Sequence, residues 1–120
     1  MKLDDDLRLE ILEKVGIYCN RFSILEPKVL LTTKEVLDMP KKMTEGRRTT
    51  AYKYYGVAYI PENLVFINVK KILDVKLLEN TLVHELIHFR FPYLSHGRRF
   101  KKLIRQGLSG KTFPPYKKRK

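Results

Sequence analysis

The stretch HELIHFRFPYLSHGRRF (residues 84–100) contains the candidate functional site of this chain of 120 residues. It contains all 3 histidines of the protein. Residues four positions apart on a helix project from the same face, so His84 and His88 form a pair with Glu85 beside them. A proline then ends the helix, and the turn after it lets the chain bring His96 back to the same side.

A helical HExxH string is the arrangement found in zinc peptidases, and a catalytic zinc ion takes three protein ligands and a water. His84 and His88 supply two ring nitrogens. Because no Asp, Glu or Cys follows Glu85, His96 is the conventional candidate for the third ligand in that segment. We therefore predict one Zn²⁺ ion held by these histidines, with Glu85 as the general base that takes a proton from the attacking water. The alternatives are a polar helix face that binds no metal and, for His96, an ordinary surface histidine.

The run HELIHFRFPYLSHGRRFKKLI resembles the active-site region of SprT-like and minigluzincin-type minimal zincins. In that region an HExxH helix and a short loop are followed by a His and the pattern Gly-x-x-Phe, which residues 96–100 match here. The similarity covers about residues 50–105 and is strong over 81–104. It implies a small zincin-like peptidase domain with zinc held by the same three histidines and Glu85 as general base. Gluzincins proper use a glutamate as third ligand, and none follows here, which favours the SprT-like pattern.

The rest of the sequence predicts one α+β domain over residues 1–108. Apolar residues at three- and four-residue spacing predict an N-terminal helix over about residues 4–21. Short apolar or β-branched runs predict a small mixed or antiparallel sheet, with strands at residues 29–31, 49–60 and 64–68. The last two strands are joined by the turn Pro61-Glu62-Asn63, so they are expected to form a hairpin.

Two further helices are expected around the candidate site, and one before the hairpin. Asp74 is expected to cap the HExxH helix. A final helix over residues 98–106 is expected to follow it, closed by Gly107 and Gly110. Before the hairpin, Thr33 is expected to cap a brief helix, and residues 41–48 are expected to form an exposed loop.

The resemblance also implies that an extended peptide substrate pairs with a sheet edge above the metal, by strand addition. The strand that contains Leu64, Val65 and Phe66 is one candidate edge, and the strand within residues 52–60 is the other. Both can equally be ordinary core strands. Tyr93, between the ligand histidines, is a candidate to stabilise the oxyanion of the tetrahedral intermediate. The alternative is that Tyr93 packs against the turn.

Positive charge is concentrated after the HExxH string. The net charge is +12, and all 13 acidic residues lie at or before Glu85, whereas eleven of the 25 basic residues follow it. A block of this kind can contact nucleic acid or acidic substrates, or it can be only the solvated side of an amphipathic helix. The resemblance to SprT-like peptidases implies protein substrates on DNA, so DNA association is a candidate beside peptidase activity. The alternative is a non-catalytic zinc-bearing module that binds nucleic acid through this block. The basic residues of the final helix are Arg98, Arg99, Lys101, Lys102 and Arg105.

The C-terminal segment is a candidate to regulate the enzyme. Residues 109–120 form a basic, proline-containing tail, which is a candidate to keep the enzyme latent by lying in its own cleft or, in a homodimer, in a neighbour's. The alternative is a disordered solubilising tail.

Cys19 is the single cysteine, which excludes a disulfide framework and a cysteine-based zinc site. The acidic N-terminus and the absence of a long apolar run predict a cytoplasmic protein with no membrane partner.

Overall fold

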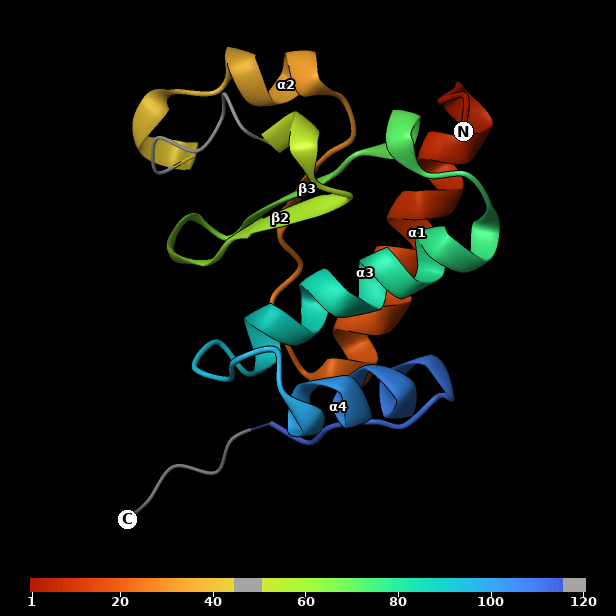
Figure 1. Ribbon diagram of the computed structural model, residues 1–120, viewed down its shortest axis with the longest axis vertical. Coiled ribbons are helices and arrows are strands. Elements are labelled where there is room, and N and C mark those ends of the chain that lie inside the picture. The colour runs from red at the N-terminus through yellow and green to blue at the C-terminus, as the bar shows by residue number, and fades with distance from the viewer. Residues whose placement is uncertain (45–50, 116–120) are drawn as a thin grey trace.

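The fold places one long helix between a small sheet and two further helices. The computed structural model describes residues 1–44 and 51–115. In chain order, the helices and strands of these residues are α1 (Asp5–Phe22), β1 (Lys28–Leu30), α2 (Thr33–Asp38), β2 (Gly56–Tyr59), β3 (Leu64–Ile67), α3 (Val75–Arg90) and α4 (Arg98–Leu108). Figure 1 shows α3 between the sheet and α4, with α1 alongside. This arrangement confirms the predicted α+β class. None of the helices in the described ranges is long and apolar enough to cross a membrane.

Helix α1 supplies one wall of the core. It begins where the Asp4 carboxylate accepts a hydrogen bond from the Leu7 N–H at 2.8 Å, and it ends at Ser23, whose φ of 56° is left-handed. Burying a large apolar side chain contributes about 1.5–3 kcal/mol, so the inner face fixes the helix on the core. The buried residues of that face are Ile11, Val15, Tyr18, Cys19 and Phe22. The predicted N-terminal helix is confirmed.

The three strands of the described residues form a mixed sheet in the order β1-β3-β2. Val65 of β3 lies opposite Val29 of the parallel strand β1 and opposite Ala58 of the antiparallel strand β2. All four residues of β3 are buried. β2 and β3 form the predicted hairpin, and Asn63 in its turn has a left-handed φ of 51°.

The prediction that Leu64, Val65 and Phe66 form a substrate-binding edge is wrong. These residues belong to the central strand, whose backbone is paired on both sides. The parallel partner β1 comes from a distant part of the sequence, and local patterns do not reveal such a pairing. The edge strand that contacts α3 is β2, which lies in the other candidate segment.

The region before the hairpin differs in detail from the prediction. Thr32, not Thr33, caps α2, because its hydroxyl oxygen accepts a hydrogen bond from the Glu35 N–H at 3.1 Å. In the predicted loop over residues 41–48, Lys41–Thr44 forms a 3-10 turn. The last four positions of that loop lie outside the described residues.

Two glycines mark other differences. The strand predicted over residues 49–60 begins only at Gly56, because Ala51–Lys53 forms a 3-10 turn. The first two positions of the predicted strand lie outside the part of the chain that the structure describes. Gly107 does not close the final helix but lies inside α4, buried where a Cβ would come within 2.9 Å of the Phe22 ring.

Phe113 brings the end of the described chain back into the core. Its side chain is 6 % exposed, and its ring centroid lies 5.4 Å from that of Phe22 and 5.5 Å from that of Phe91. The Phe113 N–H donates to the Arg21 carbonyl at 2.7 Å, and the Phe113 carbonyl accepts from the Ser23 hydroxyl at 2.6 Å. The segment after α4 is therefore tied to the end of α1.

The core thus extends beyond residue 108, where the sequence pattern places the end of the domain. A single buried aromatic residue in a segment without periodicity gives no signal in the sequence. The latency and homodimer contacts predicted for residues 109–120 stay predictions, because residues 116–120 lie outside the described part.

Candidate metal centre

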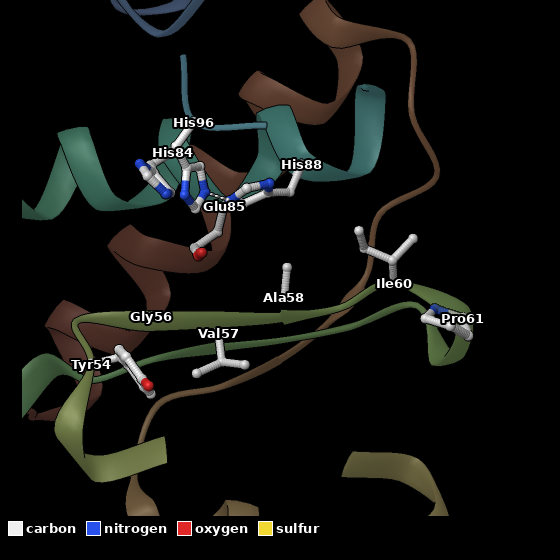
Figure 2. Close-up of a pocket in the computed structure, with 10 residues that line it drawn as sticks. All are labelled: Tyr54, Gly56, Val57, Ala58, Ile60, Pro61, His84, Glu85, His88 and His96. Carbon is white, nitrogen blue, oxygen red and sulfur yellow. Dashed lines mark hydrogen bonds between the residues drawn. The ribbon is translucent and has the colours of Figure 1, made fainter. Parts of the chain in front are cut away.

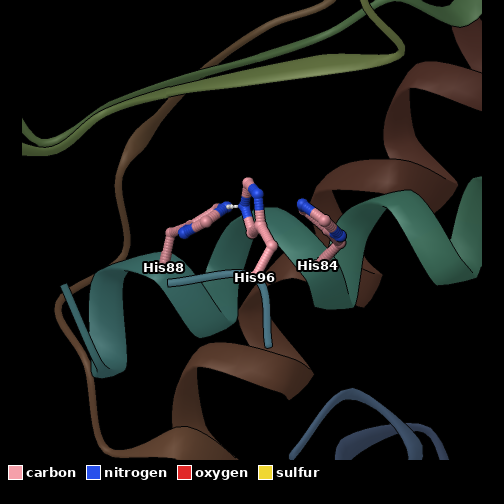
Figure 3. Close-up of side chains that lie close together, drawn as sticks. All are labelled: His84, His88 and His96. Atoms are coloured by element: carbon pink, nitrogen blue, oxygen red, sulfur yellow. Dashed lines mark hydrogen bonds between the residues drawn. The ribbon is translucent and has the colours of Figure 1, made fainter. Parts of the chain in front are cut away.

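One helix and the turn after it bring the 3 histidines together. His84 and His88 lie one turn apart on α3. Pro92 follows the end of this helix, and backbone hydrogen bonds within the next residues reverse the chain before α4 begins. Figure 3 shows the imidazole of His96 reaching from this turn into the space between the other two rings.

The ring nitrogens are close enough for one metal ion. One nitrogen from each of His84, His88 and His96 lies within 4.8 Å of the others. The Nε2 atoms of His88 and His96 are 2.9 Å apart. Because zinc–nitrogen bonds measure about 2.0–2.1 Å, two nitrogens bound to one ion lie at most about 4.2 Å apart, so small rotations of the imidazoles bring all three nitrogens onto one ion. Imidazole donors suit zinc, copper, iron and nickel, so the donor set fits a bound transition metal. The predicted cluster of three histidines is confirmed.

The ring of Phe100 packs against all three imidazoles. Its side chain is 1 % exposed, and its ring centroid lies 5.1 Å from that of His84, 4.6 Å from that of His88 and 4.9 Å from that of His96. Packing of this kind limits the rotamers of the histidines. The Phe of the Gly-x-x-Phe pattern therefore holds the ligands in place, a role that the sequence did not indicate.

The two helical histidines are held in the form that binds a metal. Burial, with a smaller contribution from the charge of His96, lowers the pKa of His84 below its ordinary value. Burial, together with the neighbouring imidazoles, lowers the pKa of His88 to about 4. Both rings are thus neutral at pH 7, with a lone pair available to a metal ion.

Glu85 lies in the wall of a cleft between α3 and β2. Only 5 % of this residue is exposed, and Figure 2 shows its carboxylate pointing from the helix toward the strand, close to the histidines. The cleft has a volume of about 570 Å³. Besides Glu85 and the three histidines, it is lined by Tyr54, Gly56, Val57, Ala58, Ile60 and Pro61. The nitrogen ligands and one carboxylate therefore face the same space.

Tyr93 lies outside this cleft. Its side chain is 73 % exposed, and the described residues that line the cleft do not include it. The geometry thus gives no support to its predicted role at an oxyanion. Sequence reasoning named the strand within residues 52–60 as a candidate substrate edge but did not single out Gly56. A glycine within a strand often marks the close approach of another element, and that was the available signal.

Helix α4 turns a basic face to the solvent. Its buried side includes Phe100 and Gly107, which pack toward α3 and α1. The exposed side carries the basic residues predicted for nucleic-acid contact, and the helix contains no acidic residue. These residues are Arg98, Arg99, Lys101, Lys102 and Arg105. The structure therefore places five cations on one accessible surface.

Comparisons with protein families, with curated proteins and with solved structures gave no match for this chain. Function is therefore inferred from the chemistry of the cleft. That chemistry combines three nitrogen ligands for one metal ion, a shielded carboxylate and an edge strand along one wall. Such a combination suits hydrolysis of a bond in a chain that lies extended along the strand.

Proposed function

We propose that this protein is a zinc-dependent metallopeptidase with a zincin-like active site, acting on peptide or protein substrates. The observation that carries the proposal is the meeting of His84, His88 and His96 beside the carboxylate of Glu85 in one cleft. Hydrolysis of a peptide bond by an activated water needs both a metal site and a general base. The cleft brings three candidate metal ligands and one carboxylate to the same wall, which supports the proposal.

Zinc is the metal proposed for this site. Within the described residues, the cluster consists of three histidines, with no cysteine or carboxylate as a fourth member. Structural zinc sites are closed by four protein ligands, whereas catalytic sites use three and keep one position open. A three-histidine set that opens on a cleft of about 570 Å³ therefore fits a catalytic ion better than a structural one.

Glu85 moves the proton in the proposed reaction. When bound, zinc supplies Lewis acidity, lowering the pKa of a water toward about 7 and polarising a carbonyl oxygen. A carboxylate oxygen of Glu85 takes a proton from the attacking water and then gives it to the nitrogen of the leaving amine. Because Glu85 is only 5 % exposed, bulk water competes little for that proton.

Strand β2 is the proposed edge for the substrate backbone. It pairs with β3 on one side, and its residues line the cleft. A peptide that adds to β2 as an extended strand passes beside the histidines. A second hollow of about 240 Å³, lined in part by Tyr55, Leu77 and Thr81, adjoins the cleft at Gly56. The substrate can therefore extend on both sides of the site, which favours endopeptidase activity.

Two measurements test the peptidase proposal. Protein purified without a histidine tag should contain about one zinc ion per chain. Wild type should cleave an unfolded protein substrate, whereas Glu85→Gln should keep the metal and lose activity by a factor of about 10² or more. A metal-free wild type that takes up no added zinc, or equal activity in the Gln variant, would overturn the proposal.

A second candidate function is nucleic-acid binding by the basic face of α4. The observation that favours it is the set of five exposed cations on a helix without acidic residues. Phosphate contacts make such binding strongly salt-dependent. Duplex and single-stranded DNA should shift in a gel at low salt, and charge reversal at Lys102 and Arg105 should weaken the shift. The absence of any shift at low salt would contradict this function, as would an equal shift by the charge-reversed variant.

A further inference from the structure

Glycine at position 56 lets Glu85 lie against the sheet. A Cβ atom built on Gly56 would come within 2.9 Å of Cγ of Glu85 and 3.2 Å of its Cδ. On the other side, the same Cβ would meet the backbone oxygen of Phe66 at 3.1 Å. The methylene of Glu85 thus occupies the space that any other side chain at position 56 would fill.

This part of the sheet has little freedom to move away. Gly56 is the first residue of β2 and pairs with Ile67 of the central strand. Just before it, the chain is tied down by Asn68, which is 6 % exposed. The side-chain amide of Asn68 donates to the carbonyls of Tyr52 and Tyr54, each at 3.2 Å.

The backbone of Asn68 adds a third hydrogen bond. Its N–H donates to the carbonyl of Tyr55, the residue next to Gly56, at 2.8 Å. One buried asparagine therefore holds residues 52–55 through both its side chain and its backbone. Because the start of β2 is fixed in this way, a methyl group at position 56 must be accommodated by movement of Glu85 and not by retreat of the strand.

We propose that Gly56, held in place by Asn68, is a positioning residue that sets how far the carboxylate of Glu85 reaches into the cleft. The inference rests on the proposed peptidase function. General-base catalysis requires the carboxylate within about 2.6–3.2 Å of the proton it takes, and a displacement of about 1 Å can cost about 10² in rate. The three atoms nearest to the added Cβ belong to Glu85 and Phe66 and not to a histidine, so the metal site itself should stay unchanged.

The test is a double-mutant cycle between positions 56 and 85. Gly56→Ala should lower kcat by about 10- to 100-fold, with little change in KM, while zinc affinity stays within about twofold of wild type. Glu85→Ala removes Cγ and Cδ, the two side-chain atoms that the added Cβ would meet, and this arm is read as unfolding temperature because the proposed base is gone. In that background Gly56→Ala should lower the unfolding temperature less than it does in wild type.

Two other glycines provide matched controls. Gly16→Ala makes the same change on α1, where a Cβ would meet only Glu26 at 3.5 Å, and it should leave kcat unchanged. Gly107→Ala should lower the unfolding temperature, because its Cβ would come within 2.9 Å of Phe22 and 3.0 Å of Val83, and leave kcat of the folded protein unchanged. The pair separates loss of stability from displacement of Glu85.

Several outcomes would overturn the inference. They are a wild-type kcat in Gly56→Ala, an equal loss of unfolding temperature from Gly56→Ala in the wild-type and Glu85→Ala backgrounds, or an unfolded Gly56→Ala that Glu85→Ala does not restore. Because the cycle is read as unfolding temperature in metal-free protein, it tests the contact without any activity. An inactive wild type would therefore count against the peptidase function, whereas additive unfolding temperatures would count against the role of Gly56.

Discussion

The Nε2 atoms of His88 and His96 lie 2.9 Å apart although the first belongs to a helix and the second to the turn that follows it. A hydrogen bond between two imidazoles requires that one donates and the other accepts. A metal ion would replace this bond, with both nitrogens directed at the ion. The pair is therefore the point at which metal binding links α3 to the start of α4.

The first prediction concerns this link. Zinc at about 100 times its Kd should stabilise the folded protein by about 2.7 kcal/mol, since it binds only the assembled site. His96→Ala should bind zinc far more weakly and lose most of that gain. Thermal unfolding with and without zinc measures both effects. An equal gain in wild type and His96→Ala would show that His96 is not a ligand.

The second prediction concerns Phe100, whose ring packs against the three candidate ligand histidines. Phe100→Leu should cost about 1 kcal/mol or more in unfolding free energy, because a smaller side chain replaces a buried ring, and should lower zinc affinity about tenfold because the imidazoles lose their support. Phe113→Leu is the matched control, since Phe113 is also buried but lies against Phe22 and Phe91. It should lose similar stability and keep its zinc affinity. Equal zinc affinities in the two variants would show that Phe100 does not hold the ligand histidines in place.

The third prediction concerns pH. The pKa of His88 is about 4 in the folded protein against an ordinary 6.5, so the unfolded chain binds the proton more tightly. In metal-free protein, the contribution of neutral His88 to the free energy of unfolding is therefore fully present above pH 6.5 and is lost as the pH falls toward 4. The lowered pKa of His84 acts in the same direction. Because solvent screens part of its surroundings, His88 contributes about 1–2 kcal/mol to this decline.

Chemical denaturation at a series of pH values measures this slope. His88→Gln removes the imidazole whose pKa is lowered to about 4, so the free energy of unfolding should fall less between pH 6.5 and 4. A wild-type slope retained in His88→Gln would show that other groups cause the acid sensitivity.

The fourth prediction concerns the segment after α4. Phe113→Ala should lower the free energy of unfolding by about 3–5 kcal/mol, because a buried aromatic ring leaves the core. Deletion of residues 116–120 should leave stability unchanged. The same deletion tests the predicted latency: an increase in peptidase activity per folded molecule would support it, and unchanged activity would contradict a role for those five residues.

Local features of the fold were predictable from the sequence, and long-range ones were not. The cap at Asp74 and the hairpin turn that contains Asn63 depend on neighbouring residues, so pattern and propensity located them. The pairing of β1 with β3 joins distant segments, and nothing local shows which strand lies at the edge. That is why the sequence left two candidate edges open, of which the segment with Leu64 proved to be the central strand.

The same division holds within the site. His84, Glu85 and His88 were predictable because helical periodicity alone puts them on adjacent faces. The position of His96 beside the other two histidines was predictable from the helix break at Pro92 and from the lack of other conventional ligands after Glu85. Gly56 was not identified: a glycine within a strand signals a close approach, but the spacing of residues does not show that the approaching side chain is Glu85 of α3.

Strand β2 is only 4 residues long, from Gly56 to Tyr59. At about 3.3 Å per residue it offers roughly 13 Å of edge, which a helix or a folded loop cannot pair with. The proposed peptidase would therefore select targets by the state of their backbone more than by their side chains. Unstructured termini, nicked loops and locally unfolded segments would be cleaved, and intact domains would be spared.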